Sequence, residues 1–308
     1  MQHNLNGPDT ALHSYFAREL PPILRVQSGD SVRYTNLHSA SWHYATEAGL
    51  VFDNRVESQP MGGHCLVGPV YIEGAQPGMT LEIIIGEIIP AHLGWNRGGG
   101  EGWDHFEQLG VSGENARFSW EIDVERGEAR SDYGLAVPIA PFLGVIGMPP
   151  DEEGIHPTIP PRVTGGNIDL KALTAGARLF LPIAVEGGLV SVGDGHAAQG
   201  DGEASGTAVE CPMLQADLTY VLHPNMKLST PRAITADAYY SLGFDVDLNK
   251  AVYLAMNDML DWMMALRGLS RQAALSYAST IVDVHVTQFV NYVKGAHARL
   301  PRAVAEGA

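Results

Sequence analysis

The sequence predicts a mainly β fold, with β-sandwich-like or barrel-like units and a smaller C-terminal α+β portion. Between about residues 23 and 221, short apolar runs are separated by Gly, Pro, Asn or Asp, as in all-β sandwiches and barrels. After about residue 245, apolar residues instead recur at the spacing of a helix. The 35 glycines among 308 residues also imply many tight turns.

We divide the chain into three predicted units. The N-terminal β unit spans residues 1–150 and includes a segment rich in Gly, Trp and acidic residues, 90–119, which we interpret as a lid loop because long loops in compact domains are usually functional or disordered. The second β unit spans residues 151–244 and carries the run GDGHAAQGDGE at 193–203. Residues 245–308 form the C-terminal α+β unit.

The strands of the first two units are predicted from repeated local patterns. Residues 27–34, 76–83 and 174–181 each place a Gly two or three residues before a strand-like run, which favours repeated β units over βαβ crossovers. Residues 81–89 (LEIIIGEII) are apolar on both faces for most of their length. Such a run is typical of a strand that is covered on two sides.

The C-terminal unit is predicted to contain two helices. Apolar residues at helical spacing extend over 248–266, Gly268 follows as a C-cap, and Ser270 is an N-cap for the second helix. The Val-rich segment 280–293 is either a strand or a buried helix, since periodicity alone does not decide. One helix face carries four methionines, which we assign mainly to the core, with a subunit contact as the alternative. They are Met256, Met259, Met263 and Met264.

Composition excludes several classes of function. The 19 basic and 35 acidic residues give a net charge of −16, which repels phosphate backbones and anionic lipids. The two cysteines lie in no CxxC spacing, and no apolar run approaches the roughly 18 residues that a bilayer requires. We therefore expect a soluble, cytoplasmic protein that binds neither nucleic acid nor a membrane.

The densest polar cluster follows an apolar run that ends near residue 192. Asp194 and His196 lie two positions apart, so in a strand they share one face and can reach one ion. An imidazole and carboxylates suit zinc or a similar divalent cation. The alternative is a hydrogen-bonded turn. Glu203 is either a base or a ligand, and the pattern does not separate these roles.

Three further groups of polar residues are candidates. The Gly-Gly-Asn run at 165–167 exposes backbone N–H groups, although such a run is usually a turn. His38, His43 and His64 are packed or surface residues unless they approach the Asp-His pair in space. Glu73 stands between a strand-like run and a Gly turn, where burial would raise its pKa for acid–base catalysis. Capping of that turn is the alternative role.

Five segments resemble the acetamidase/formamidase family of amide hydrolases. They are GPVYIEGAQPG at 68–78, PFLGVIGMPP at 141–150, GGNID at 165–169, GDGHAAQGDGE at 193–203 and VDVHVTQ at 282–288. The resemblance implies a mainly β fold that hydrolyses short aliphatic amides to a carboxylate and ammonia. It also implies metal assistance, with Asp194 and His196 at the matching ligand positions. The chain departs from the family pattern at His38 and Met79, where acidic residues are usual.

These observations lead to one hypothesis for the site, in which a divalent metal, with zinc as the first choice, assists an amidohydrolase that acts on linear amides. The expected metal ligands are His38, Asp194 and His196. The expected catalytic residues are Glu73, Glu203 and Asn167, with either Glu73 or Glu203 as the proton shuttle. The expected substrate-binding residues are Gly165, Gly166, Gln199 and His64, the two glycines as oxyanion donors.

Two other functions stay open at this point. One is hydrolysis of a larger or cyclic amide, or of a related C–N bond. The other is a noncatalytic β protein whose Asp-Gly turn holds a structural ion such as calcium. The expected partner is a small-molecule amide, and we also expect a homo-oligomer, with a dimer as the favoured state.

Overall fold

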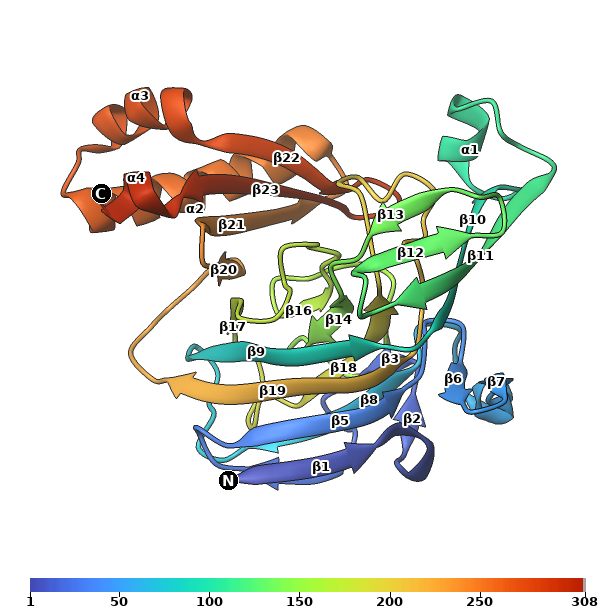
Figure 1. The fold of residues 1–308 in the computed structure, drawn as a ribbon. Coiled ribbons are helices and arrows are strands. Elements are labelled where there is room, and N and C mark those ends of the chain that lie inside the picture. The colour runs from blue at the N-terminus through green and yellow to red at the C-terminus, as the bar shows by residue number, and fades with distance from the viewer. Residues whose placement is uncertain (307–308) are drawn as a thin grey trace.

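The computed structural model describes residues 1–306, and most elements in it are β-strands (Figure 1). The predicted mainly β class with a smaller helical C-terminal part is confirmed. The largest sheet has nine strands. In spatial order they are β1 (Gln2–Asn6), β5 (Ser31–Leu37), β19 (Met213–His223), β9 (Thr80–Pro90), β17 (Arg178–Pro182), β20 (Arg232–Ile234), β21 (Ala238–Asp245), β23 (Lys294–Pro301) and β22 (Asp283–Gln288).

The other sheets are smaller. A six-stranded sheet contains β16 (Gly165–Asn167), β14 (Phe142–Gly147), β18 (Val190–His196), β8 (Leu66–Ile72), β2 (Leu12–His13) and β4 (Leu24–Val26). A four-stranded sheet contains β10 (Leu93–Gly99), β11 (Asn115–Asp123), β12 (Glu128–Ser131) and β13 (Ala136–Pro138). Two ribbons pair β3 (Tyr15–Phe16) with β15 (His156–Pro157) and β6 (His43–Thr46) with β7 (Gly49–Phe52).

The main core lies between the nine-stranded and the six-stranded sheets. Alternate residues of β5, β9 and β19 point into it, and Tyr34 and Tyr220 meet there through their hydroxyl groups at 2.5 Å. Val190 and Val192 of β18 belong to the same buried cluster. This packing holds the last residues of β18 rigidly, because interiors of this kind are close-packed.

Strand β9 confirms the strand predicted at residues 81–89. It pairs with β19 on one side and with β17 on the other. Glu82 interrupts the apolar pattern because its buried carboxylate forms ion pairs with Arg178 at 2.5 Å and with His223 at 2.6 Å. A buried carboxylate is tolerated when it is paired in this way.

The C-terminal part has two main helices, α2 (Leu248–Arg267) and α3 (Arg271–Ile281), and a short α4 (Arg302–Glu306). Gly268 ends α2 with a φ of 64°, and the Ser270 hydroxyl accepts from the Ala273 N–H at the start of α3. Both predicted caps are therefore confirmed. Met259 and Met263 are buried in the helix–sheet core, as expected.

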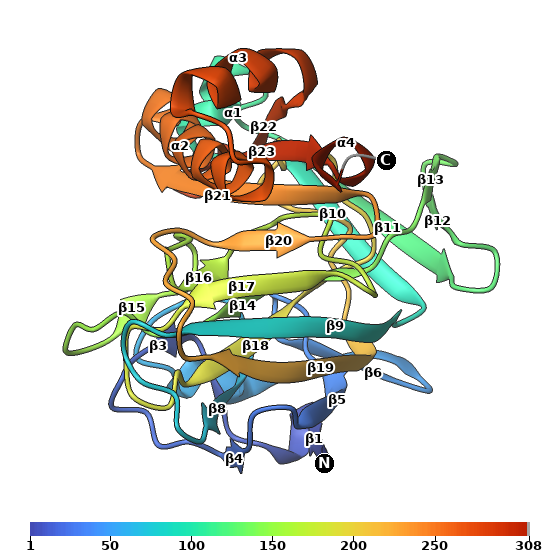
Figure 2. The ribbon, with the colours of Figure 1, turned by 90° about the vertical axis from the view of Figure 1, so that its left-hand side faces the viewer.

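The ambiguous segment 280–293 contains strand β22, because β23 supplies an antiparallel partner for it. Helices α2 and α3 lie beside the β21–β23–β22 edge of the large sheet, while β1 forms the opposite edge (Figure 2). Among residues 1–306, no helix combines the length and the apolar composition that crossing a bilayer requires.

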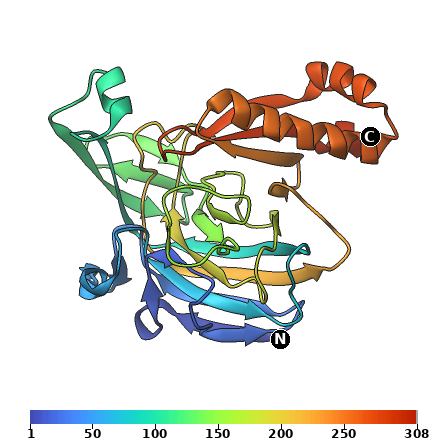
Figure 3. The ribbon, with the colours of Figure 1, turned by 180° about the vertical axis from the view of Figure 1, so that it is seen from behind.

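The segment predicted as a lid loop, residues 90–119, is more ordered than expected. It contains β10, helix α1 (Asp104–Gln108) and the first half of β11, and β10 pairs with β11. This arm and the β6–β7 ribbon lie on the side of the molecule opposite α3 (Figure 3). Strands from all three predicted units share the nine-stranded sheet, so the predicted boundaries at 150 and 244 do not separate sheets.

Candidate functional site

The predicted Asp-His pair lies at the end of β18, with both side chains on one face. Asp194 and His196 are 2% and 1% exposed. The glycines that alternate with them are required by the neighbouring backbone, since a Cβ at Gly193 would lie 2.3 Å from Cys65 O and one at Gly195 2.5 Å from Cys211 O. The G-D-G-H pattern thus packs its glycines against adjacent backbone and leaves the two polar side chains together.

Three more carboxylates surround this pair and complete a five-residue group that we call the acid–histidine cluster. It consists of Asp169, Asp194, His196, Glu203 and Glu210, all buried. His196 Nε2 lies 3.2 Å from Asp194 Oδ1 and 3.3 Å from Glu210 Oε1. Two sets of potential ligand atoms lie within 4.8 Å of one another, namely Asp194–His196–Glu210 and Asp169–His196–Glu203.

The backbone of the cluster is strained. In residues 1–306, seven residues other than glycine have positive φ, and three of them are Asp169 (53°), Asp194 (59°) and Glu203 (47°). Such conformations cost on the order of 1–3 kcal/mol each and persist where the surrounding structure enforces them, often at functional sites. The fold therefore holds these carboxylates together at a cost in stability.

The cluster contains more hydrogen-bond acceptors than there are donors to pair with them. In the described part of the chain, its atoms without a hydrogen bond are His196 Nε2, Asp169 Oδ1, Glu203 Oε2 and Glu210 Oε2. Buried polar atoms without partners are rare in native proteins and call for an explanation. One imidazole and several carboxylate oxygens converging within a few ångströms form a donor set that fits a divalent cation such as zinc.

Hydrogen bonds around the cluster fix the imidazole ring. Gln199 Oε1 lies 3.0 Å from His196 Nδ1, and Gln199 Nε2 donates to the Asp169 carbonyl at 2.8 Å. This partner on Nδ1 leaves Nε2 directed at the carboxylates, as is usual for histidines that bind metals. Gln199 thus positions His196, and it is not among the residues that line the adjacent cavity.

Burial and charge separate the pKa values of the cluster. Burial raises the pKa of Glu203 to about 8, and burial with the Glu203 and Asp194 charges raises the pKa of Asp169 well above its ordinary value. Burial also acts to raise the pKa of Asp194, but His196 and His64 outweigh it and hold that pKa below its usual range. Asp194 is therefore ionised at neutral pH, while Glu203 retains its proton.

A cavity of about 210 Å³ opens beside the cluster. Its lining includes Asp194, Glu203 and Glu210 together with Trp95 and Asn167. Trp95 Nε1 and Asn167 Oδ1 are buried and have no hydrogen-bond partner among residues 1–306, so a donor and an acceptor are free at its wall. A larger cavity of about 830 Å³ beside α1 and β10 has none of the five cluster residues in its lining.

His64, which is predicted to bind substrate, is among the residues that line this cavity. Its Nδ1 lies 2.8 Å from Thr158 Oγ1, and its Nε2 lies 3.9 Å from Asp194 Oδ2. Gly165 and Gly166 are buried in β16 and do not line the cavity. Gly165 donates its N–H to Arg162 O at 3.0 Å, so that N–H is not free to bind an oxyanion.

His38 and Glu73 lie outside the cluster. His38 Nε2 lies 2.9 Å from Asp53 Oδ2, and none of the groups of potential metal ligands within residues 1–306 contains His38. Glu73 forms a bidentate pair with Arg25 at 2.7 and 3.2 Å, and this pair lowers the pKa of Glu73. The expectation of a raised pKa at Glu73 is wrong because an arginine from β4 reaches this carboxylate.

Two cluster residues, Asp169 and Glu210, are absent from the predicted site. Asp169 lies two residues after the end of β16, and its Oδ2 accepts from Asn291 Nδ2 at 2.9 Å. Glu210 is brought beside His196 by an isolated antiparallel bridge between these two residues. No short spacing in the sequence signals this bridge, because the connecting segment of 13 residues between them has no regular pattern.

Comparisons with known proteins agree with this geometry. The model of the acetamidase/formamidase family matches residues 151–231, a segment that contains all five residues of the acid–histidine cluster. An acetamidase from Mycolicibacterium smegmatis is 27% identical over 66% of this chain, and a formamidase from Methylophilus methylotrophus is 28% identical over 63% of it. The matches span 64% and 60% of those relatives, less than two thirds of their length.

The fold comparison extends over the whole chain. A crystal structure of a recombinant predicted acetamidase/formamidase from Thermoanaerobacter tengcongensis superposes with a TM-score of 0.85 at 26% identity, covering 100% of this chain and 98% of that one. The family domain carries the buried cluster, and the remaining strands have the arrangement found in that relative. The chain is thus similar to the acetamidase/formamidase family in sequence over residues 151–231 and to a solved acetamidase/formamidase in fold over its whole length.

Proposed function

We propose that this protein hydrolyses short linear amides, of the formamide and acetamide type, to a carboxylate and ammonia. The observation that carries the proposal is the acid–histidine cluster at the wall of a cavity of about 210 Å³. The names of the relatives, acetamidase and formamidase, support the substrate class.

We further propose that the cluster holds a divalent cation. Asp194, His196 and Glu210 would be its ligands, since their ligand atoms lie within 4.8 Å of one another. The imidazole favours zinc over calcium, which takes oxygen ligands. When bound, such an ion would polarise the amide carbonyl and acidify a water molecule.

Glu203 has the proton that the leaving group needs. An amide nitrogen leaves poorly unless it is protonated, and a carboxylic acid with a pKa near the working pH is an efficient donor. Burial raises the pKa of Glu203 to about 8, and the side chain lines the cavity. We therefore assign the proton transfer to Glu203, because Glu73 lies outside the cavity lining and is paired with Arg25.

Trp95 and Asn167 would orient the substrate. The indole N–H of Trp95 is free to donate to the amide carbonyl, and Asn167 Oδ1 is free to accept from the amide NH₂ group. Pairing both atoms removes the cost of leaving them buried without partners. The small cavity and its three acidic lining residues disfavour bulky or anionic substrates.

The proposal is tested by ammonia release from formamide, acetamide, butyramide and benzamide. We expect turnover of the two small amides and a fall in kcat of about 10²-fold or more in Glu203→Gln, which keeps the shape but loses the titrating group. Glu73→Gln is the matched control and should retain activity. Normal turnover in Glu203→Gln would refute the assigned role, and no release of ammonia from any of the amides by the wild-type protein would refute the proposed activity.

A further inference from the structure

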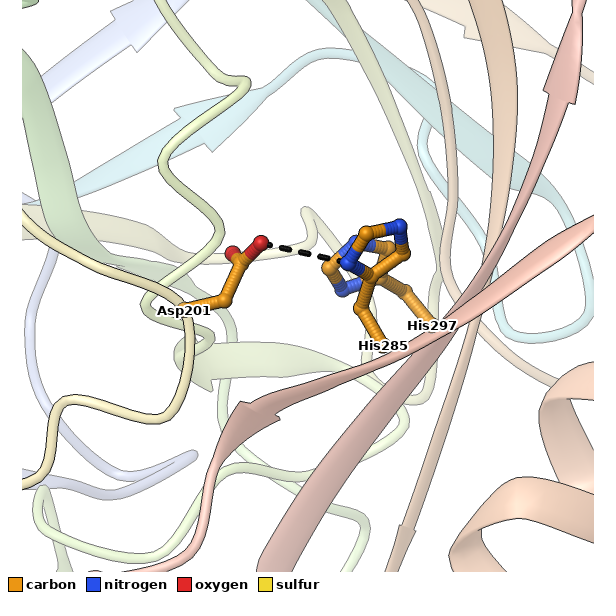
Figure 4. A group of neighbouring side chains, drawn as sticks. All are labelled: Asp201, His285 and His297. Carbon is orange, nitrogen blue, oxygen red and sulfur yellow. Dashed lines mark ion pairs between the residues drawn. The ribbon is translucent and has the colours of Figure 1, made fainter.

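A second group of metal-binding side chains lies outside the acid–histidine cluster. It consists of Asp201, on the loop after β18, and His285 and His297, on β22 and β23 (Figure 4). The two histidines are direct cross-strand partners, and their rings stack with centroids 5.0 Å apart and an interplanar angle of 7°. One potential ligand atom from each residue lies within 4.8 Å of the other two.

The spacing within this group is close to that of ligands on one ion. Asp201 Oδ2 lies 3.3 Å from His285 Nδ1. Two ligands at about 2.1 Å from a tetrahedral ion lie about 3.4 Å apart. Two of the three side chains therefore already have the required separation.

The imidazole ring of His297 is held in place by a hydrogen bond. Thr287 Oγ1 lies 2.8 Å from His297 Nδ1 and fixes the ring, as a hydrogen bond to the other ring nitrogen does in metal-binding histidines. Within residues 1–306 the hydrogen bond of this ring is at Nδ1, and Nε2 has none.

We propose that Asp201, His285 and His297 bind Zn²⁺ or a similar transition-metal cation. Two imidazoles and one carboxylate form a donor set that such ions prefer to the oxygen ligands of Mg²⁺ or Ca²⁺. His285 and Asp201 side chains are 37% and 24% exposed, which leaves room for a water molecule as the fourth ligand. The site is independent of the proposed catalytic metal because it shares no residue with it.

The cation would fasten the loop that carries Glu203 to the C-terminal hairpin. Gly202 already donates its N–H to Thr287 O at 3.0 Å, so the loop runs beside β22 without an ion. A metal on Asp201 adds a side-chain connection one residue away. The expected consequence is a more stable loop, because an ion that binds only the folded state stabilises it.

Lys171 provides an internal check on this assignment. Its Nζ lies 3.0 Å from Asp201 Oδ2, so the ammonium group competes with a cation for the same oxygen. Replacement of Lys171 by Met removes the competing charge and preserves most of the apolar stem. We expect Lys171→Met to bind the ion several-fold more tightly than the wild-type protein. Loss of a surface charge remote from the site would not change the affinity in this way.

The experiment measures Zn²⁺ binding by untagged, metal-stripped protein, with equilibrium dialysis for stoichiometry and calorimetry for Kd. We expect His285→Ala and Asp201→Asn each to bind one ion fewer per chain than the wild-type protein, with a smaller Zn²⁺-induced rise in Tm. His92→Ala, which changes an exposed histidine elsewhere, is the matched control and should bind like the wild-type protein.

The outcomes separate this site from the proposed catalytic metal. If the acid–histidine cluster binds no ion, the wild-type protein still binds one Zn²⁺ and His285→Ala binds none. Equal stoichiometry in the wild-type protein and His285→Ala would overturn the proposal. An unchanged or higher Kd in Lys171→Met would show that Asp201 is not a ligand.

Discussion

Substitution of Gly144 by Ala should disturb the acid–histidine cluster although it replaces none of the five cluster residues. Gly144 lies in β14, next to the cluster, and its φ is not in the left-handed region. The backbone itself therefore permits alanine. A Cβ there would lie 2.3 Å from Asp194 Oδ2, 2.8 Å from Asp169 Oδ1 and 2.8 Å from His196 Cε1.

The size of the effect follows from these distances. Ordinary contacts of a Cβ begin at 3.4 Å, so the Asp194 oxygen must move by about 1 Å. Asp194 is 2% exposed, and the open space beside it is limited to the cavity of about 210 Å³ that it lines. A misplacement of about 1 Å at a reacting centre costs about 10²-fold in rate, and overpacking of a buried site costs about 1–3 kcal/mol of unfolding free energy.

The assay is kcat/KM for ammonia release from formamide and acetamide, together with urea unfolding. Gly98→Ala is the matched control, because Gly98 is also a strand glycine without positive φ and an added Cβ would meet nothing within 4 Å. We expect kcat/KM to fall by about 10²-fold in Gly144→Ala only. A folded Gly144→Ala protein with wild-type kcat/KM would refute the placement of the cluster at the reacting centre.

Two further predictions concern stability. Burial lowers the pKa of His13 to about 4 from 6.5, so the unfolded chain binds this proton more readily than the folded protein. The free energy of unfolding should therefore fall as pH falls from 6.5 towards 4, by about 2 kcal/mol at pH 5. In urea unfolding, His13→Gln should flatten the dependence of this free energy on pH, and an unchanged slope would contradict the reasoning. Asp258→Asn breaks the bidentate pair of Arg232 and Asp258, at 2.7 and 2.9 Å, between β20 and α2. We expect Asp258→Asn to lose about 2 kcal/mol of unfolding free energy, whereas the exposed control Asp261→Asn should change little. Equal urea midpoints in the two variants would count against this prediction.

The sequence alone determined the features that depend on neighbouring residues. Strands separated by Gly and Pro, the Gly268 and Ser270 helix caps, and the shared face of Asp194 and His196 all follow from backbone geometry over a few positions. These predictions agree with the structure because a strand alternates its side chains and a helix needs capped ends in any tertiary context.

The tertiary structure decided which distant residues meet. Glu210 reaches His196 through a bridge across 13 intervening residues, and Asp169 comes from the segment after β16, whereas Glu73 meets Arg25 instead. Segment 280–293 forms a strand because β23 offers hydrogen-bond partners. Burial, charge pairing and strand pairing between remote segments carry no local signature, so only the folded chain reveals a cluster of four carboxylates around one histidine.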